Sequence, residues 1–313
     1  MEEKKVSRKP LVELQDVRKK IGRKEIIHGL SFNIYGGEVF GFLGPNGAGK
    51  TTTIRMMVGL MKLSGGKILI NGKNIQTEYK QAVSNVGAIV ENPEMYKFLT
   101  GYQNLIHYSR MVKGVSKSRI AEMVELVGLT DRIHEKVKTY SLGMRQRLGL
   151  AQALLHSPSV LILDEPTNGL DPAGIREIRH YLRELAEKEG IAVIVSSHLL
   201  SEMEIMCDRI AIIQHGKLIG VQSTKEFVES GSTRKVRFLV DEVAAARHAV
   251  SHHVKDERMT LGNGYIEAEM ERDLIPEVTA TLVVEGIKVY GISSETKTLE
   301  DKFLEVTGGK EVV

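Results

Sequence analysis

The 313-residue sequence lacks the features of covalently stapled or membrane-spanning chains. Cys207 is the only cysteine, so an intrachain disulfide is impossible and a reducing compartment is expected. No stretch approaches the roughly 18 consecutive apolar residues that a bilayer-spanning helix needs. Residues 1–10 are rich in Glu, Lys and Arg and contain no apolar segment, which excludes a signal peptide. These absences predict a chain that is soluble by itself.

The overall composition excludes several further classes of protein. With 42% hydrophobic and 27% charged residues, the chain is neither a disordered segment nor a disulfide scaffold, and its 30 glycines follow no collagen-like repeat. At roughly 100–200 residues per domain, its length predicts two domains, or one large and one small domain.

The net charge of +3 is unevenly distributed along the chain. Residues 224–313 carry 12 Lys or Arg against 17 Asp or Glu, a net charge of −5, so residues 1–223 carry +8. A basic first part favours a polyanionic ligand there, such as nucleoside phosphates or nucleic acid. The acidic tail argues against a nucleic-acid-binding module in that part of the chain.

Strand-like and helix-like segments alternate along the first part of the chain. We expect strands over residues 11–17, 26–34, 39–43, 67–70, 86–90, 160–163 and 191–195, and helices over 51–61, 101–127, 143–155 and 172–189. The strands over 160–163 and 191–195 are continuously apolar, which is typical of strands buried on both faces of a parallel sheet. The alternation predicts an α/β architecture with a mixed, largely parallel sheet.

The tail has a different order of elements. Strands are expected over residues 235–240, 258–261, 265–269 and 288–293, and helices over 243–250 and 274–284. The order β-α-β-β-α-β is that of a small α+β, ferredoxin-like domain. Charge and composition change near Gly231 and Ser232, so we expect a first domain over 1–230 and an accessory domain over 231–313.

The strongest motif lies at residues 44–51, which match the pattern G-x-x-x-x-G-K-[ST] in full. It follows an expected strand and opens an expected helix, as the motif requires, and this context disfavours a chance glycine-rich turn. Glycines let backbone N–H groups face phosphate oxygens, while the lysine reaches the β/γ-phosphates and the threonine hydroxyl binds Mg²⁺. The residues expected to bind the nucleoside triphosphate are Gly44, Pro45, Asn46, Gly47, Ala48, Gly49, Lys50, Thr51 and Thr52.

A second motif places two carboxylates at the end of an apolar strand. Asp164 and Glu165 follow Val-Leu-Ile-Leu, which delivers them to the carboxyl edge of the sheet, where ligands bind in open α/β folds. Asp164 is expected to hold Mg²⁺, and Glu165 to polarise the attacking water as a general base. The alternative is a charged pair that merely closes a strand, but an accompanying phosphate-binding loop makes it the weaker interpretation.

Two further motifs identify the family that the sequence resembles. Tyr-Ser-Leu-Gly-Met at residues 140–144 precedes the Asp-Glu strand, Asn-Gly-Leu-Asp at 168–171 follows it, and Ser-Ser-His at 196–198 comes after the next strand. This order of motifs resembles that of the nucleotide-binding subunits of ABC ATPases, over about residues 10–220. Without this resemblance, Ser141 would be interpreted as an ordinary helix cap and His198 as a surface or core histidine.

The resemblance implies the fold, the cofactors and the partners. It implies an ABC cassette with ATP and Mg²⁺ bound, and a helical subdomain over about residues 92–157. It further implies a head-to-tail dimer, with itself or a related subunit, in which Ser141, Leu142, Gly143 and Met144 contact the nucleotide of the other subunit. His198 is implied to contact the γ-phosphate. Membrane permease subunits on separate chains are the implied partners, which places the chain in the cytoplasm on the inner face of the membrane.

Two positions depart from the usual pattern of the family. Ile21 occupies the place of an aromatic residue that stacks on adenine, so apolar contact is expected there without stacking. Glu91 stands where most relatives carry Gln, and its carboxylate can still accept a hydrogen bond from a Mg²⁺-bound water. Glu91, the following Asn-Pro and the 140–144 motif resemble the bacitracin-resistance and lantibiotic-immunity exporters. A tail segment over 298–305 resembles one found in exporter ATPases, or is simply a capped amphipathic helix.

We therefore expect the ATP-hydrolysing subunit of an ABC exporter, with an antimicrobial peptide or another amphiphile as its cargo. The alternative is a soluble ABC-type ATPase that acts on nucleic acid or ribosomes. Its DNA-repair members need a long coiled coil, and the sequence shows no sustained heptads. Its ribosome-acting members usually carry two cassettes joined by a basic linker, whereas this chain has one cassette and an acidic tail.

Overall fold

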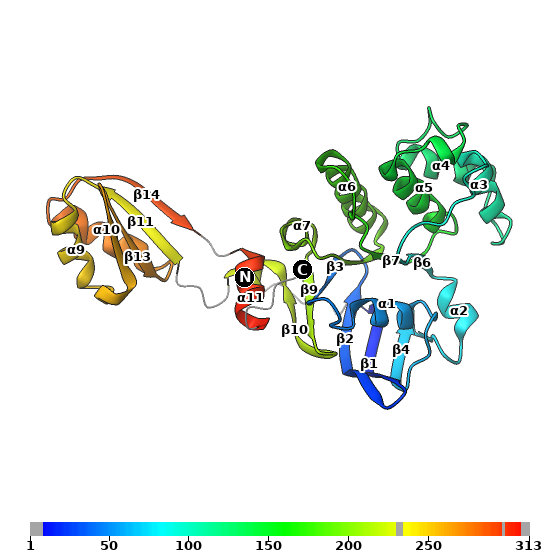
Figure 1. Cartoon of the computed structure of the whole chain (residues 1–313), viewed down its shortest axis with the longest axis horizontal. Coiled ribbons are helices and arrows are strands. Elements are labelled where there is room, and N and C mark those ends of the chain that lie inside the picture. The colour runs from blue at the N-terminus through cyan, green and yellow to red at the C-terminus, as the bar shows by residue number, and fades with distance from the viewer. Residues whose placement is uncertain (1–8, 230–233, 296–297, 308–313) are drawn as a thin grey trace. The chain divides into compact units, whose positions relative to one another are not determined.

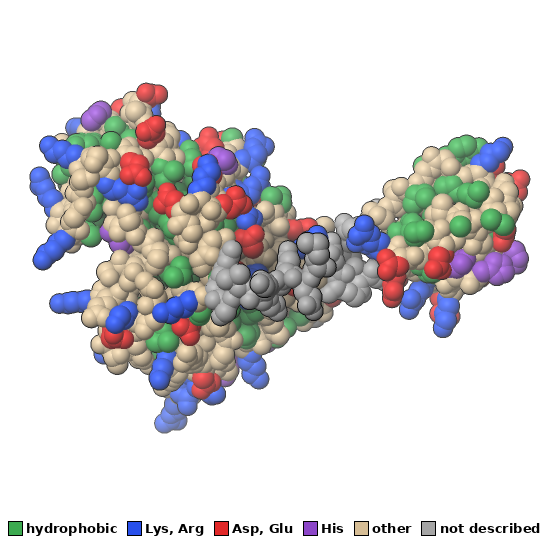
Figure 2. All heavy atoms as spheres, turned by 180° about the vertical axis from the view of Figure 1, so that it is seen from behind, with side chains coloured by type: hydrophobic (Ala, Val, Ile, Leu, Met, Phe, Trp, Pro, Cys, Tyr) green, Lys and Arg blue, Asp and Glu red, His purple; other side chains and the backbone are tan. Residues whose placement is uncertain are grey.

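A computed structural model describes residues 9–229, 234–295 and 298–307. These residues form two compact units that divide after Thr224 (Figure 1). The expected boundary at Gly231 and Ser232 lies outside the described residues. In Figure 2, Lys and Arg side chains are spread over the visible face of the first unit.

The first unit is built on a six-stranded sheet. Its order is β10 (Lys217–Ser223), β9 (Arg209–Gln214), β3 (Val39–Leu43), β8 (Ala192–Ser196), β7 (Val160–Asp164) and β6 (Val86–Ile89). All neighbouring strands run parallel except β9 and β10. Every residue of β3, β7 and β8 is buried, as their apolar runs predict. The expectation of an α/β fold with a mixed, largely parallel sheet is confirmed.

A second, antiparallel sheet completes the core of this unit. Its order is β2 (Lys24–Tyr35), β1 (Pro10–Ile21), β4 (Gly65–Ile70) and β5 (Lys73–Asn74). Phe32 from this sheet packs on Phe40 of β3, with ring centroids 5.6 Å apart. Helix α1 (Lys50–Met57) contributes Ile54, Met56 and Met57 to the same core, each without exposed surface. This burial fixes the helix that follows the 44–51 loop.

Between β6 and β7 the chain forms a helical lobe, which Figure 1 shows as one cluster. It contains α3 (Gly101–Ser109), α4 (Lys117–Leu126) and α5 (Leu142–Leu154), and a short α2 (Tyr79–Val83) precedes it. The expected continuous helix over 101–127 is wrong, because α3 ends before Gly114, whose φ is 87°, and Ser116 starts a new helix. The Ser116 hydroxyl accepts a 3.1 Å hydrogen bond from the Arg119 amide, which caps α4.

Two helices complete the first unit, of which only one was expected. Helix α6 (Pro172–Glu189) has its predicted bounds, because Asp171 caps it, accepting a 2.9 Å bond from the Gly174 amide, and Gly190 ends it with φ 69°. Helix α7 (Leu200–Met206) was not expected, and neither were strands β9 and β10. No helix in the described ranges is both long and apolar enough to span a bilayer.

The second unit contains a four-stranded antiparallel sheet. The sheet order is β12 (Met259–Gly262), β13 (Tyr265–Met270), β11 (Arg234–Val240) and β14 (Val289–Glu295). Helices α9 (Val243–Ser251) and α10 (Leu274–Val284) supply Ala246 and Leu282 to a core shared with Phe238 and Ile266. The order of elements is the one that the sequence predicts.

Two further helices, α8 (Thr224–Glu229) and α11 (Leu299–Thr307), begin and end this part of the chain. The tail segment over 298–305 forms a capped helix: Thr298 and Asp301 each accept a hydrogen bond from the other's amide.

Candidate functional site

The residues predicted to carry chemistry follow strands whose carboxyl ends meet at one edge of the six-stranded sheet. The 44–51 loop follows β3, Glu91 follows β6, Asp164 and Glu165 follow the apolar part of β7, and His198 follows β8. These four strands are parallel neighbours, in the order β3-β8-β7-β6. Parallel strands bring their carboxyl ends to the same edge, so residues far apart in sequence gather there.

The backbone of the 44–51 loop is packed so closely that two of its glycines leave no room for a side chain. A Cβ atom on Gly44 would lie 2.3 Å from the carbonyl oxygen of Ile213, and one on Gly49 would lie 2.4 Å from Cδ1 of Ile27. Gly49 also has φ 107°, in the left-handed region. A hydrogen bond of 3.0 Å from the Ala48 amide to the Pro45 carbonyl closes the loop. The loop therefore has the close-packed, glycine-dependent form of a backbone cradle for an anion.

Lys50 supplies a buried positive charge at the base of this loop. Its side chain is 8% exposed, and its ammonium donates a 2.5 Å hydrogen bond to the Gly44 carbonyl. Burial lowers the pKa of Lys50, while the negative charges of Glu165 and Asp164 act in the opposite direction. Within the described ranges, no carboxylate lies within 4.0 Å of this ammonium. A buried cation that is only partly compensated fits an anionic ligand in the loop.

Ser196 joins the ends of β7 and β8, a role that the sequence analysis did not identify. Its hydroxyl donates a 2.5 Å hydrogen bond to Asp164, whose carboxylate is 5% exposed, and accepts a 3.1 Å bond from the Glu165 amide. The Ser196 carbonyl accepts a second bond from that amide, at 3.2 Å. Ser196 therefore holds the carboxylate of Asp164 and the backbone of Glu165.

Glu165 and His198, the two predicted catalytic residues, are in direct contact. Nδ1 of His198 lies 2.7 Å from Oε2 of Glu165, and the His198 amide donates a 3.3 Å hydrogen bond to the same oxygen. Glu165 has a left-handed backbone, with φ 53°, at the turn after β7. The two side chains are 29% and 40% exposed, so both can be reached from solvent.

Glu91, the third predicted metal ligand, forms an ion pair with Arg55 of α1. Arg55 was not singled out from the sequence. The described part of the chain has no cluster of three or more His, Cys, Asp or Glu side chains that could hold a metal ion by themselves. The hydroxyl of Thr51 and the carboxylate of Asp164 are hard oxygen donors of the kind that Mg²⁺ takes together with phosphate oxygens and water.

The predicted signature residues lie at the start of α5. The Ser141 hydroxyl caps this helix and accepts a 3.2 Å hydrogen bond from the Met144 amide. Ser141, Leu142 and Gly143 line a hollow of about 390 Å³ together with residues of the 169–178 segment. No residue of the 44–51 loop lines this hollow. The signature residues and the 44–51 loop therefore do not share this hollow.

Ile21 lies at the end of β1, where β1 turns into β2, and is 53% exposed. The Ile21 side chain is therefore accessible, as the predicted contact with adenine requires.

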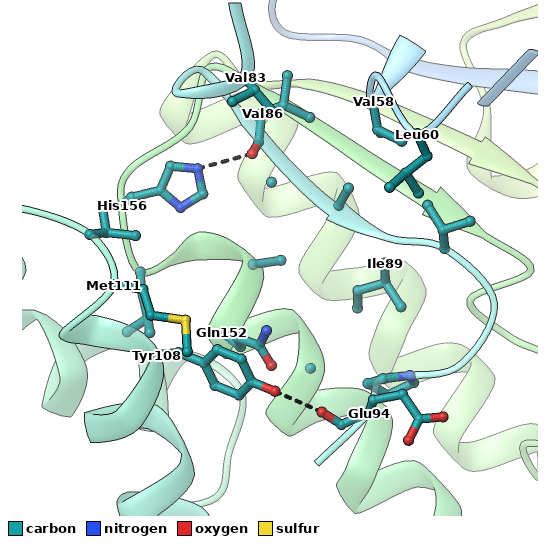
Figure 3. Close-up of a pocket in the computed structure, with 18 of the residues that line it drawn as sticks. Val58, Leu60, Val83, Val86, Ile89, Glu94, Tyr108, Met111, Gln152 and His156 are labelled. Atoms are coloured by element: carbon teal, nitrogen blue, oxygen red, sulfur yellow. Dashed lines mark hydrogen bonds between the residues drawn. The ribbon is translucent and has the colours of Figure 1, made fainter. Parts of the chain in front are cut away.

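A groove of about 710 Å³ runs between β6 and the helical lobe (Figure 3). Ile89, Tyr108 and Met111 line it, and Gln152 of α5 forms part of its wall. The Tyr108 hydroxyl donates a 2.8 Å bond to the Glu94 carbonyl, and burial raises the pKa of Tyr108. The groove is therefore partly apolar and is bounded by the 90–94 segment that connects β6 to the helices.

Known proteins share the sequence over nearly its whole length. The family profile described as ABC transporter matches residues 27–168. The chain is 60% identical to the uncharacterized ABC transporter ATP-binding protein YhcH of Bacillus subtilis (strain 168), across 96% of this chain and 97% of that protein. It is 37% identical to the bacitracin transport ATP-binding protein BcrA of Bacillus licheniformis, across 96% of this chain and 98% of that protein.

A solved structure shares the fold of the first unit. CbiO1 from Clostridium perfringens, described as part of the ABC transporter complex cbiONQ, is 26% identical with a TM-score of 0.64, covering 69% of this chain and 90% of that chain. With YhcH and BcrA matched along 96% of its length, the chain belongs to the ABC transporter ATP-binding proteins, the ATPases of these transporters.

Proposed function

We propose that this ATPase hydrolyses Mg²⁺-bound ATP to drive an exporter whose pore is formed by separate membrane subunits. The observation that carries the proposal is the convergence of Lys50, Asp164 and Glu165 at one edge of the parallel sheet. Charge from both carboxylates acts on the Lys50 ammonium, which places the cation and the two anions in one electrostatic environment.

Each part of the edge has a distinct task in this proposal. The amides of residues 44–51 and the Lys50 ammonium bind the phosphates, and Ile21 contacts the adenine ring. Thr51 and Asp164 hold Mg²⁺, and Glu91 accepts a hydrogen bond from water in its shell. When bound, the metal neutralises charge on the β- and γ-phosphate oxygens.

Glu165 is the proposed general base. Its carboxylate accepts a proton from the water that attacks the γ-phosphorus, and ADP leaves as the bond to the β–γ bridging oxygen breaks. The 2.7 Å contact with His198 orients the carboxylate, and Ser196 accepts two hydrogen bonds from the Glu165 amide, which hold its backbone. His198 is then positioned to donate to the γ-phosphate.

We propose a head-to-tail dimer in which Ser141, Leu142, Gly143 and Met144 of one subunit contact the nucleotide held by the other. The support is that Ser141 lies at a helix N-terminus, where amides and the helix dipole favour an anion. No residue of the 44–51 loop lines the hollow that contains Ser141, which supports a site completed by the loop of a second subunit.

The groove between β6 and the helical lobe is the proposed contact with the membrane subunit. Leu60 and Met111, which line it, are 68% and 65% exposed, so the groove offers apolar surface to a partner. Together with residues 91–102, this surface would couple the ATP site to the permease. The chain then works at the cytoplasmic, inner face of the membrane.

The cargo is proposed from similarity to the bacitracin transport protein. We propose that the chain serves export of an antimicrobial peptide or a similar amphiphile. The proposed domains are 1–230, with a helical subdomain over about 92–157, and 231–313. The strand order β12-β13-β11-β14, with two helices sharing the core, supports a ferredoxin-like accessory domain.

Mixing two inactive variants tests the shared sites. Lys50→Ala removes the phosphate-binding cation, and Ser141→Arg blocks the signature. Each mixed dimer retains one intact composite site, so we expect partial recovery of ATP hydrolysis. Ser116→Arg is the matched control, because Ser116 also caps a helix of the helical lobe but lies outside the signature. Activity no higher than that of the separate variants would refute the shared-site dimer.

Purification from membranes in detergent tests the transporter role. The tagged chain should retain a multi-span membrane protein, and substitution of Met111 by Glu in the groove should release it. Retention of ribosomes or nucleic acid in place of a membrane protein would favour the alternative function.

A further inference from the structure

The segment that connects β6 to the helical lobe is held at two points. At Glu91, a side-chain ion pair joins the segment to Arg55 of α1. At Pro93, the ring packs onto the backbone of α5, because a Cβ atom on Gly149 would lie 2.6 Å from Cβ of Pro93. A single residue, Asn92, therefore separates the contact with α1, which follows the 44–51 loop, from the contact with α5.

The backbone at Glu91 has an uncommon conformation. Glu91 has φ 68°, in the left-handed region that residues with a Cβ atom rarely adopt. Such a conformation persists where the surroundings hold it. The ion pair with Arg55 supplies such a hold from outside the segment.

Arg55 is well placed to connect this segment with the ATP site. It lies four residues after Thr51 on α1, and therefore on the same face of the helix. Long side chains on a helix lean towards its N-terminus, which for Arg55 is the end that carries Thr51. The helix itself is anchored by Ile54 and Met57, which have no exposed surface.

We propose that Arg55 is a positioning residue and that the Arg55–Glu91 ion pair is a latch between the phosphate-binding helix and the signature helix. While the pair is closed, Glu91 is directed to Arg55, and Pro93 holds α5 in the matching position. The pair opens when Glu91 turns to the nucleotide site, and α5 is then free to move with the segment. This inference rests on the assignment of Glu91 under the proposed function.

Spin labels on the two lobes test the latch without hydrolysis. The native Cys207 is buried and burial raises its pKa, so it resists labelling. Labels at Lys113→Cys, beyond α3, and Lys188→Cys, on α6, lie at exposed positions of the helical lobe and the core. Pulsed electron–electron double resonance, with no nucleotide added, then gives the distribution of distances between the two labels.

In this background, Arg55→Met removes the charge and keeps most of the side chain, and Glu91→Gln removes the partner's charge. Both side chains are partly exposed, at 39% and 64%, so the pair is of modest strength. For each variant, the ratio of molecules at the main inter-label distance to molecules at all other distances should therefore fall by about two- to fivefold. The double variant should add nothing to the single ones, and Arg55→Lys should restore the wild-type distribution.

The matched control is Arg179→Met, because Arg179 forms a 3.1 Å ion pair with Glu202 between α6 and α7, away from the segment. This control should leave the distribution unchanged. The latch is refuted if Arg55→Met behaves like the control, or if the effects of Arg55→Met and Glu91→Gln are additive. The distance measurement does not involve ATP hydrolysis. If the wild-type protein did not hydrolyse ATP, that result would refute the proposed function and not the latch.

Discussion

The six-stranded sheet of the first unit and the four-stranded sheet of the second unit place their polar side chains in different ways. In the first unit, the ends of β3, β6, β7 and β8 bring the candidate functional residues to one edge. In the second unit, neighbouring strands run antiparallel, so successive strand ends lie at opposite edges. Its polar side chains pair locally: Arg237 lies 2.6 Å from Glu267 of the neighbouring strand and 4.4 Å from the Tyr265 ring centroid.

The parallel sheet therefore gathers charged side chains for a candidate site, whereas the antiparallel sheet pairs its charged side chains with each other. At the parallel edge, Lys50 and Asp164 are buried, and the Lys50 ammonium has no carboxylate within ion-pair distance in the described ranges. On the antiparallel sheet, a charged group finds its partner directly across the strands. The catalytic function should therefore be sensitive to single atoms at the first edge, and the second unit should respond to changes in packing.

The largest expected effect is that of Glu165→Gln. Removing the proposed base should slow ATP hydrolysis about a thousandfold, or about 4 kcal/mol in activation free energy, while ATP binding persists. Phosphate release and equilibrium nucleotide binding are the measurements. Glu187→Gln, whose side chain is 62% exposed on α6, is the control and should keep normal turnover. Near-normal hydrolysis by Glu165→Gln would remove the base from the mechanism.

The next effect tests whether the second unit is only a scaffold. Phe238 is fully buried in its core, so Phe238→Ala should destabilise that unit by about 3 kcal/mol. ATP binding by the first unit should remain. Urea unfolding, followed by a probe in each unit, measures both.

The neighbouring Leu239 gives the matched control for Phe238, because it is 43% exposed on the same strand. Leu239→Ala should leave both unfolding transitions nearly unchanged. If Phe238→Ala lowers the stability of the first unit equally, the two units do not unfold independently.

Much of the first edge could be predicted from the sequence, because its motifs are contiguous. The loop at 44–51 and the pair Asp164 and Glu165 each follow an apolar strand, and the bounds of β3 and α6 were predicted without error. Short segments were missed: α7 has seven residues, too few for a helical period to show.

The contacts between motifs could not be predicted. Ser196 bonds to Asp164 across 32 residues of sequence, and Arg55 pairs with Glu91 across 36. No local pattern encodes such pairs, since the register of the strands and the position of α1 bring them together. Glu91 was identified from a motif, but its partner in the structure was not.

Ser196→Ala sharpens the comparison at the parallel edge. It removes a hydrogen bond to a buried carboxylate, which should cost about 2 kcal/mol in the free energy of unfolding. Ser197→Ala is the control, because the Ser197 hydroxyl accepts a bond only from the neutral amide of Leu199 in the described contacts, and its loss should cost about 1 kcal/mol. If both variants lost the same free energy of unfolding in denaturant titrations, the hydrogen bond to Asp164 would contribute no more to stability than the bond to a neutral amide.

The smallest expected effect concerns the opposite, amino-terminal edge of the same sheet. Nε2 of His156 donates a 3.0 Å hydrogen bond to the carbonyl of Val86, the first residue of β6 (Figure 3). Burial lowers the pKa of His156, the charge of Arg119 adds to this, and the bond to Val86 opposes it. The folded protein therefore favours the neutral imidazole more than the unfolded chain does.

The sign of the pH dependence follows from this lowered pKa. Below the ordinary value of 6.5, the unfolded chain binds the proton first, so stability is present above that pH and is lost as the pH falls towards the lowered value. His156→Gln should flatten this part of the stability curve, measured by urea unfolding between pH 5 and 7.5. His180→Gln, whose side chain is 69% exposed on α6, should leave the slope unchanged. An unchanged slope in His156→Gln would mean that protonation at this edge does not affect folding.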